Sequence, residues 1–273
     1  MIEEIWENIR REAMINAHQE PILASYLHAT ILNHTSPMAA LSYILASKLD
    51  GPTASALLIR EVIEEAFEAN ATAFSEAVAY DLDAVLKRDS ACDEFSTPFL
   101  YYKGFHALQA YRVAHWLWNQ NRKPFALFLQ NRISVVFSVD IHPAAVIGKG
   151  IMFDHATGIV VGETARVDDH VSIMQSVTLG GTGKESGDRH PKIRRGVLIG
   201  AGAKILGNII VGENALVGAG SVVLKEVEPH AIVAGVPAVK VGETGQRNPA
   251  DEMCYDWEEK TSITHENTAK LPV

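Results

Sequence analysis

From residue 139 onward a large apolar residue recurs at every sixth position, and this period restricts the fold more than any other feature of the chain. The series slips by two residues once and is interrupted once; it passes through Ile141, Ile147 and Phe153, then Val161, Val167, Ile173 and Leu179, then Ile193, Ile199, Ile205, Val211, Val217 and Val223. A helix would show a period of 3.6 and a half-exposed strand a period of two. Repetition every six residues is typical of a triangular solenoid, in which each hexapeptide forms one short strand and one corner.

Three hexapeptides would complete each coil, and the recurring residue is expected to point inward and pack on the coils above and below. Small residues and turn formers follow it, as in "IGAG" and "VGEN", because glycine and asparagine tolerate the backbone angles of a tight corner. We therefore predict a solenoid domain over residues 139–242. The fourteen steps from Leu179 to Ile193 break the period, so residues 180–192, "GGTGKESGDRHPK", are expected to form an extruded loop suited to ligand contact.

The first half of the chain follows a helical period instead. Within "LLIREVIEEAFEANA" apolar residues recur at helical spacing, at Ile59, Val62, Ile63 and Phe67. Residues 1–138 are expected to form six to eight helices, one of which runs about six turns from Thr97 as N-cap and Pro98 as its first residue. Residues 243–273 lose the hexad and are polar, which predicts a flexible tail. The predicted fold class is α+β, an all-α domain followed by a parallel β-solenoid.

Composition excludes several classes of protein. The 273 residues carry a formal charge of −9, which argues against nucleic-acid binding, because phosphate contacts need a basic face. No apolar run is long enough to span a bilayer, and the acidic start does not resemble a secretory signal. The two cysteines, Cys92 and Cys254, belong to no metal-binding motif and fit a reducing compartment. We expect a cytoplasmic protein.

Asp154 and His155 stand side by side where the apolar series slips. His155 follows the inward-facing Phe153 by two positions, so its side chain is expected near a corner, outside the core. Asp140 precedes His155 by fifteen residues, slightly less than one coil, and is expected at a similar angular position on the adjoining coil. A carboxylate that accepts a hydrogen bond from one ring nitrogen would leave the other nitrogen as a base.

The extruded loop adds groups that would suit an amino acid. Arg189 offers a planar fork for a carboxylate, and His190 beside it is a further hydrogen-bonding group. Asp154 and Asp89 are acids of the type that holds an ammonium group.

Four stretches together resemble the bacterial serine acetyltransferase family: "STPFLYYKGFHALQAYRVAHWLWNQ", "VDIHPAAVIGKGIMFDHATGIVVGETA", "SVTLGGTGKESGDRHPKI" and "VLIGAGAKILGNIIVGENALVGAGSVV". The resemblance extends to about residue 243. It implies that the solenoid is a left-handed parallel β-helix. It also implies transfer of an acetyl group from acetyl-CoA to the hydroxyl of L-serine, the first step of cysteine synthesis from serine, by direct attack and without a metal.

The resemblance assigns roles residue by residue. The family's catalytic histidine falls on His155 and its partnering aspartate on Asp140. The residues that hold the amino acid fall on Asp89, Asp154, Arg189 and His190. The candidate contacts of acetyl-CoA are small residues that let pantetheine lie against the prism and lysines that meet phosphates: Gly181, Thr182, Gly183, Ala201, Ala219, Lys225 and Lys240.

The resemblance also implies partners. Sites between neighbouring solenoids imply a homotrimer, and two trimers joined through their helical domains would give a hexamer. L-cysteine is expected to inhibit at the serine site. In relatives the tail often ends in an isoleucine that inserts into O-acetylserine sulfhydrylase; Val273 stands in that place here, a departure that weakens the expected contact.

Three alternatives stay open at this point. A γ-type carbonic anhydrase would gather His155, His170 and His190 around a metal at a trimer interface. A sister acyltransferase would accept homoserine or an amino sugar. A structural solenoid would need no catalytic residue at all.

Overall fold

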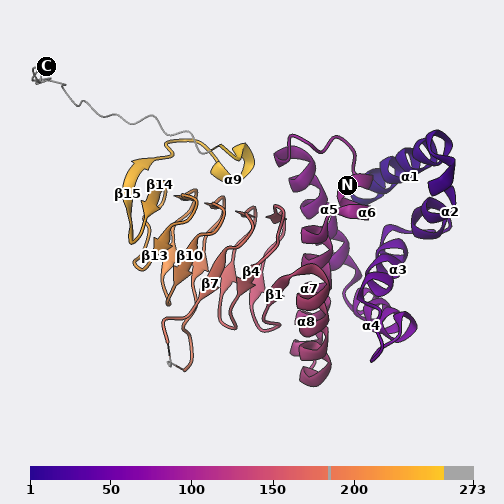
Figure 1. Cartoon of the computed structure of the whole chain (residues 1–273), viewed down its shortest axis with the longest axis horizontal. Coiled ribbons are helices and arrows are strands. Elements are labelled where there is room, and N and C mark those ends of the chain that lie inside the picture. The colour runs from indigo at the N-terminus through magenta and orange to yellow at the C-terminus, as the bar shows by residue number, and fades with distance from the viewer. Residues whose placement is uncertain (184–185, 255–273) are drawn as a thin grey trace, which may run out of the picture.

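The computed structural model describes residues 1–183 and 186–254. Figure 1 shows two parts side by side, a layer of helices at one end of the molecule and a stack of short strands at the other. The N-terminus lies among the helices, on the side remote from the last strands.

Helices occupy the first half of the chain, as the apolar period predicts. They are α1 (Ile2–Gln19), η1 (Pro21–Leu23), α2 (Ala24–Leu27), η2 (His28–Leu32), α3 (Pro37–Leu49), α4 (Ala56–Ala69), α5 (Ala71–Arg88), α6 (Ser96–Tyr101), α7 (Lys103–Asn119) and α8 (Lys123–Phe137). The Ser36 and Ser55 side chains cap α3 and α4 by accepting from the N–H groups of Ala39 and Leu58. In α4 the four apolar residues that recur in the sequence are all buried.

The predicted six-turn helix is interrupted. Instead of one helix from Pro98, the chain forms α6 and α7, with Tyr102 in extended conformation between them. The N-cap is Phe95 rather than Thr97, so the predicted start is also wrong by two residues. Apolar spacing did not reveal the break, because the apolar residues keep a helical rhythm across it; the break places Tyr102 and Lys103 beside the solenoid, where they line a cavity.

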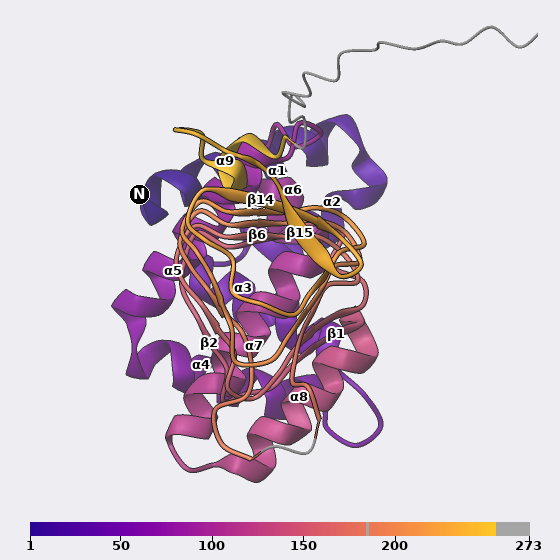
Figure 2. The same cartoon turned by 90° about the vertical axis from the view of Figure 1, so that its left-hand side faces the viewer.

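The second half forms the solenoid. Its strands are β1 (Val139–Ile141), β2 (Val146–Ile147), β3 (Met152–Phe153), β4 (Ile159–Val161), β5 (Arg166–Val167), β6 (Ser172–Ile173), β7 (Thr178–Gly180), β8 (Lys192–Ile193), β9 (Leu198–Ile199), β10 (Lys204–Leu206), β11 (Ile210–Val211), β12 (Leu216–Val217), β13 (Val222–Val223), β14 (Ala231–Gly235) and β15 (Ala238–Glu243). As far as β13, every third strand pairs in parallel; β14 then adds to β12 in parallel, and β15 to β14 in antiparallel direction. The three sheets have the orders β1-β4-β7-β10-β13, β2-β5-β8-β11 and β3-β6-β9-β12-β14-β15. Figure 2 looks along this stack and shows the three faces of the prism.

The register explains the slip and the interruption of the hexad. Lys204 pairs with Val222, eighteen positions on, as a regular coil requires. Val139 pairs with Ile159, twenty positions on, because the corner that contains His155 has two extra residues. The loop from Gly180 to Lys192 lengthens another coil, so Thr178 pairs with Lys204. All thirteen residues of the apolar series are buried, which confirms their inward direction.

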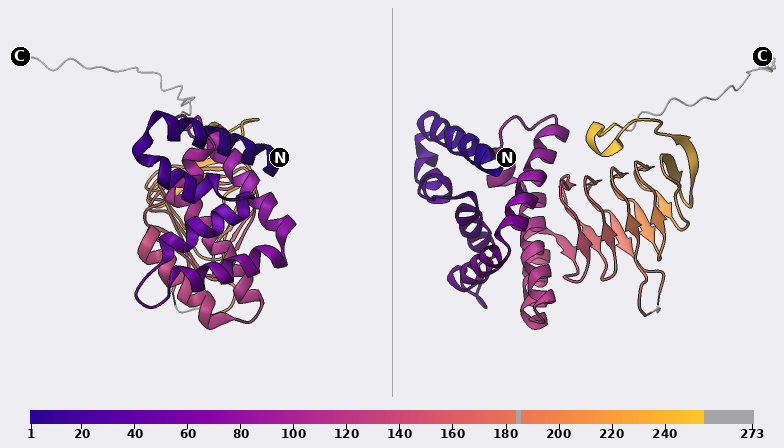
Figure 3. Two further views of the ribbon diagram at one scale, coloured as in Figure 1. Left: turned by 90° about the vertical axis from the view of Figure 1, so that its right-hand side faces the viewer. Right: turned by 180° about the vertical axis from the view of Figure 1, so that it is seen from behind.

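The chain after residue 242 begins with ordered structure. Strand β15 runs antiparallel to β14 and ends at Glu243, and the short helix α9 (Pro249–Glu252) lies back against α5, as the rear view in Figure 3 shows. Residues 243–254 therefore differ from the predicted flexible tail, because Asp251 and Ala250 find partners on α5 and β6. Residues 255–273 lie outside the described part of the chain.

Candidate functional site

His155 lies on one edge of the prism, and corners of later coils stack on the same edge. Backbone bonds run along it, from Ser176 N–H to Thr157 O (2.8 Å), from Gly202 N–H to Gln175 O (2.9 Å) and from Gly220 N–H to Ala201 O (2.8 Å). We call this line of corners, residues 154–158, 174–177, 200–203 and 218–221, the His155 edge. Ala201 and Ala219, both predicted contacts of acetyl-CoA, lie on it.

The corner that carries His155 has an uncommon backbone. His155 and Ala156 are consecutive non-glycine residues in the left-handed region, with φ of 53° and 59°. Such conformations cost about 1 kcal/mol or more each and occur preferentially at functional sites. Ala156 is buried, whereas the His155 side chain is 74% exposed, so the fold holds the ring outside the prism. In the sequence, the two-residue slip of the apolar series marked this corner.

A cavity of about 410 Å³ opens beside the ring, between the helices and the solenoid. Its lining includes Asp89, Tyr102, Lys103, Asp154 and His155. The Tyr102 hydroxyl donates to Asp89 Oδ2 (3.0 Å), and the Lys103 ammonium donates to the Thr157 hydroxyl on the corner itself. Two of the predicted serine-binding acids therefore share one cavity with the predicted base.

The electrostatics of this cavity favour a cationic ligand. Burial raises the pKa of Asp154, and the carboxylate of Asp89 raises it further, while His155 opposes the shift. Among the described residues, the acid within ion-pair distance of the His155 ring is Asp154, with 3.8 Å between Nε2 and Oδ1. Two carboxylates that repel one another are relieved by an ammonium group placed between them.

Helix α7 reaches the corner closely because its second residue, Gly104, is a glycine. A Cβ atom on Gly104 would lie 2.2 Å from the carbonyl oxygen of Phe153 and 3.1 Å from the Cβ of Ala156. No side chain fits there, so Gly104 allows α7 to form one wall of the cavity.

Asp140 does not lie where the fifteen-residue spacing placed it. It pairs with Val160 in the middle of a face, since the longer corner moves the register by two. Its Oδ1 accepts a hydrogen bond from Gln130 Nε2 (2.7 Å) in α8. Among the described residues no hydrogen bond or ion pair joins Asp140 to His155.

Arg189 and His190 lie on a different edge, where the extruded loop returns to the prism. The Thr164 hydroxyl accepts from the N–H groups of both residues, at 3.0 and 3.1 Å, and lies 2.9 Å from His190 Nδ1. Arg189 Nη2 donates to Glu163 Oε2 (2.7 Å), and this bond holds the pKa of Glu163 below its usual value. Burial and, secondly, the Arg189 charge lower the pKa of His190.

A glycine makes room for the His190 ring. A Cβ atom on Gly162 would lie 2.1 Å from both Cδ2 and Nε2 of His190, so the ring packs directly on the backbone of the "VGET" corner. His190 is 7% exposed as a result. The sequence indicated the loop but not this contact. One chain thus divides the predicted serine-binding residues between two edges, with Asp89 and Asp154 on one and Arg189 and His190 on the other.

The remaining predicted contacts of acetyl-CoA are dispersed. Thr182 lies over the next coil, where a Cβ atom on Gly207 would be 3.2 Å from its Cγ2. Gly181 lies beside the Arg189 backbone, and Gly183 is exposed. Lys225 follows β13 and is exposed. Lys240, in β15, already pairs with Glu228 (3.2 Å) and Glu243 (2.9 Å), so binding a phosphate there requires exchange of partners.

A larger cavity lies on the β5-β8-β11 face of the prism. It measures about 650 Å³ and is lined by Asp168, Arg194, Arg195 and neighbouring residues of the next coils. None of the predicted site residues lines it, so volume alone does not locate the chemistry.

The described residues also bear on two other classes of protein, metal-dependent and membrane-spanning ones. Residues 1–183 and 186–254 contain no group of three or more His, Cys, Asp or Glu residues placed to hold a metal ion. In the same part of the chain no helix combines the length and apolar character required to cross a membrane.

The solenoid is a prism of hexapeptide coils with an exposed histidine on a strained corner, above an edge of small residues. These features define the class of hexapeptide-repeat acyltransferases. Comparison with known proteins narrows the class. A family model described as "Serine acetyltransferase, N-terminal" matches residues 5–110, and one described as "Bacterial transferase hexapeptide (six repeats)" matches residues 190–225. The serine acetyltransferase of Salmonella typhimurium is 62% identical over 252 residues, 92% of each chain.

Solved structures of serine acetyltransferases are also similar to this chain. A serine acetyltransferase in complex with cysteine superposes with a TM-score of 0.92 at 58% identity, covering 94% of this chain and 100% of that one. The enzyme of Brucella abortus in complex with coenzyme A gives 0.87 at 55% identity, covering 89% and 96%. The chain belongs to the serine acetyltransferase family, and its solenoid is the left-handed parallel β-helix of that family. This decides against a carbonic anhydrase and against a purely structural solenoid, and it makes acetyl-CoA the co-substrate.

Proposed function

We propose that His155 is the general base of acetyl transfer to L-serine and that a complete serine site forms only between two chains. The observation that carries the proposal is the exposed His155 ring at the mouth of a cavity that holds two acids, Asp89 and Asp154. These acids receive the ammonium group of serine, which leaves its hydroxyl near the ring.

The chemistry of the step needs only a base and a later acid. His155 takes the proton of the serine hydroxyl while its oxygen attacks the thioester carbonyl carbon of acetyl-CoA. The tetrahedral intermediate then collapses, the C–S bond breaks, and the protonated His155 gives its proton to the departing thiolate of CoA. The products are O-acetyl-L-serine and CoA, with no net change in the enzyme.

Two carboxylates, those of Asp140 and Asp154, are candidates for the acid that orients the His155 ring. We propose Asp140, in which case its bond to Gln130 is exchanged for one to the ring when substrate binds. Asp154, at 3.8 Å, is then reserved for serine. The variant Asp140→Asn is expected to lower kcat, whereas Asp154→Asn is expected to raise KM for serine; the reverse pattern would exchange the two roles.

The second half of the site comes from a neighbouring chain in this proposal. Arg189 has the planar donor fork that binds the carboxylate of an amino acid, but it lies on another edge of the prism. A three-fold arrangement of solenoids brings one edge of each chain against a different edge of the next. We therefore propose a homotrimer, with a hexamer as the further assembly through the helical domains.

Acetyl-CoA is proposed to lie along the His155 edge. This edge is lined by small residues, Ala201 and Ala219, and an extended pantetheine chain along it would bring the thioester to His155. The buried Gln175 Oε1, which has no partner among the described residues, lies on the same edge and is suited to accept from a pantetheine amide.

The central experiment removes the base. His155→Ala is expected to lower kcat by about 10²- to 10⁴-fold or more, measured as thiol release from acetyl-CoA with L-serine, while the oligomer in solution stays intact. Asp89→Ala is expected to raise KM for serine. The assignment of serine as acceptor would be wrong if the wild-type protein released thiol above the His155→Ala background with homoserine or a hexosamine but not with serine.

The proposal also covers inhibition by L-cysteine and the role of the C-terminal tail. L-cysteine carries the same ammonium and carboxylate groups as serine, so we propose that it occupies the same cavity and competes with serine in the thiol-release assay. Non-competitive behaviour toward serine would place it elsewhere. A contact with O-acetylserine sulfhydrylase through Val273 stays a prediction, because that residue lies outside the described part of the chain, and so does a cytoplasmic location.

A further inference from the structure

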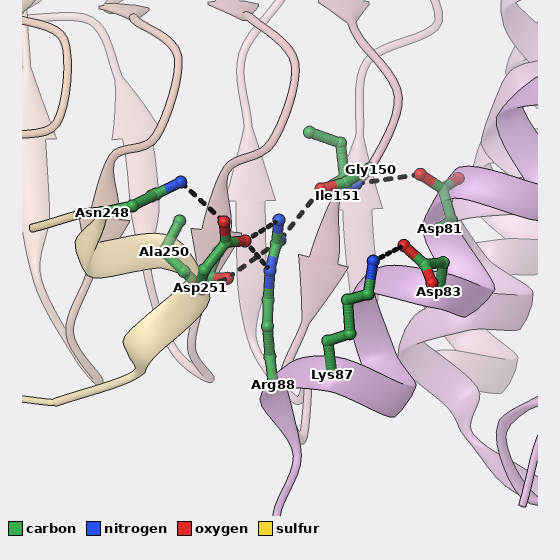
Figure 4. Close-up of polar contacts among 10 residues, drawn as sticks. Asp81, Asp83, Lys87, Arg88, Gly150, Ile151, Asn248, Ala250 and Asp251 are labelled. Carbon is green, nitrogen blue, oxygen red and sulfur yellow. Dashed lines mark hydrogen bonds and ion pairs between the residues drawn. The ribbon is translucent and has the colours of Figure 1, made fainter.

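The last residue of α5 is a buried arginine that the proposed mechanism does not use. The Arg88 side chain is 2% exposed, yet its guanidinium contacts segments far apart in the sequence, as Figure 4 shows. Nε and Nη2 donate to Asp251 Oδ1 at 2.9 and 2.7 Å. Nη1 donates to Gly150 O (2.9 Å) and to Ser172 Oγ (3.2 Å). Burial lowers the pKa of Arg88, and the carboxylate of Asp251 is the strongest group that opposes this shift.

Two side chains of α5 hold a single peptide group of the first coil. Asp81 Oδ1 accepts from the N–H of Ile151 (2.9 Å), and Arg88 donates to the carbonyl oxygen of Gly150. These two atoms belong to the same peptide unit, which immediately precedes β3 and the His155 corner. The position of α5 therefore fixes where one wall of the serine cavity begins.

The opposite wall of the serine cavity carries Asp89, which is joined to Arg88 by a peptide bond. Asp89 directly follows Arg88 and ends α5, where its backbone N–H donates to Val85 O. Its side chain accepts from Tyr102 and from the N–H of Ala91. Arg88 thus lies between the wall that carries Asp89 and the wall that carries Asp154, and it contributes to their separation.

The counter-ion of Arg88 comes from the segment after the solenoid. Asn248 Nδ2 donates to Asp251 Oδ2 (2.7 Å), and Ser172 Oγ donates to the carbonyl of Ala250 (2.9 Å). Met253 packs against a small apolar cluster of Val85, Cys92 and Met152. We call residues 248–253 the C-terminal strap. When the strap is docked, Asp251 neutralises the buried guanidinium at hydrogen-bond distance. When it is not, the hydrogen-bond partners that remain among the described residues, the Gly150 carbonyl and the Ser172 hydroxyl, are neutral, which is costly in a buried position.

We propose that the Arg88–Asp251 ion pair is a positioning pair for the serine site, through which docking of the C-terminal strap sets the separation of Asp89 and Asp154. Neither residue touches substrate. The inference rests on the proposed function, because it assumes that Asp89 and Asp154 hold the serine ammonium. By linkage, serine binding must stabilise the docked strap by the same free energy with which the strap favours serine.

The test is the variant Asp251→Asn, which keeps the shape of the side chain and removes its charge. We expect KM for serine to rise about tenfold, because the hydrogen bond that remains no longer joins two charged groups, while kcat and KM for acetyl-CoA stay within about twofold. The matched control is Asp83→Asn. It breaks the Lys87–Asp83 pair (2.7 Å) on a different face of α5 from Arg88, where Lys87 is 68% exposed, and should change neither KM beyond about twofold.

Two further measurements separate positioning from a merely structural role. Asp251→Glu should restore most of the serine affinity. Serine should slow amide hydrogen exchange in residues 248–253 of the wild-type protein but not of Asp251→Asn. If Asp251→Asn does not fold, Arg88→Lys carries the same expectations, because lysine keeps the charge but cannot reach Asp251 and Gly150 together.

The outcomes are distinct from those of the proposed function. An unchanged KM for serine in Asp251→Asn, or equal changes in kcat and both KM values, overturns the positioning role. If Asp89→Ala raises KM for serine and Asp251→Asn does not, only the inference fails. If Asp89→Ala itself has no effect on serine, the proposed serine site fails, and the inference fails with it.

Discussion

At the scale of single residues, two histidines show how surroundings decide what an imidazole does. His155 is held in the left-handed region with its ring in solvent, where it can exchange protons with a ligand. His106 is 0% exposed in the helical core, and its Nε2 lies 2.9 Å from the carbonyl of Phe99. A carbonyl only accepts, so Nε2 carries the proton, and the buried Nδ1 has no hydrogen-bond partner among the described residues. Burial lowers the pKa of His106 to about 3.

His106 predicts an acid sensitivity of the helical domain. Below about pH 6.5 the unfolded chain protonates this imidazole while the folded chain excludes the proton, so stability is complete above that pH and falls as the pH decreases toward 3. The slope from this one group approaches about 1.4 kcal/mol per pH unit. Urea unfolding at pH 7 and pH 5 should show a smaller difference for His106→Asn than for wild type. The control is the exposed His18→Asn; an equal pH effect in all three proteins would contradict the prediction.

At the scale of elements, the coils are held together by stacks of one aliphatic residue per strand. Ile199 in β9 lies between the registered residues Ile173 in β6 and Val217 in β12, and all three are fully buried. The charged and small residues of the corners project outside these stacks, so the core is specified by few positions. This is why a period of six was sufficient to predict which side chains point inward.

Truncation within such a stack should destabilise the solenoid strongly. Ile199→Ala removes three buried carbons from a site where neighbouring strands cannot close the gap, and the expected loss is about 2–5 kcal/mol in the free energy of unfolding. Ile210→Ala in β11, where the side chain is 37% exposed, should cost markedly less. Urea denaturation followed by circular dichroism compares the two variants, and similar losses would count against the stacked-core account.

At the scale of the whole molecule, the prism separates groups that the chemistry needs together. The face that contains β4 and β7 lies between the His155 edge and the edge that carries Arg189 and His190. A single chain therefore offers half of a site on each edge. The helical layer does not join them, since its contacts with the solenoid are concentrated on β1 and β3 of the first coil, with Arg88 reaching Ser172 in β6 of the second.

A shared site predicts complementation between inactive chains. His155→Ala and Arg189→Ala should each be nearly inactive, but oligomers reassembled from an equal mixture should recover up to about a quarter of wild-type activity, since one site in four combines an intact residue of each kind. Activity is measured by thiol release after joint refolding. A double variant mixed with wild type serves as the reference for subunit exchange. Complete absence of recovery in well-mixed oligomers would place both residues in a site within one chain.

The architecture could be predicted from the amino-acid sequence alone, because a solenoid repeats one local rule. The hexad of Val161, Val167 and Ile173 indicates the strands, the corners and the inward direction of the side chains. It also located the corner of His155 and the extruded loop, as departures from the period. The sequence did not reveal the break at Tyr102, the position of Asp140 or the docking of α9. Docking of α9 depends on a contact between Arg88 and Asp251, which are 163 positions apart in the sequence. Those features depend on contacts between distant segments, whose geometry only the packed structure decides.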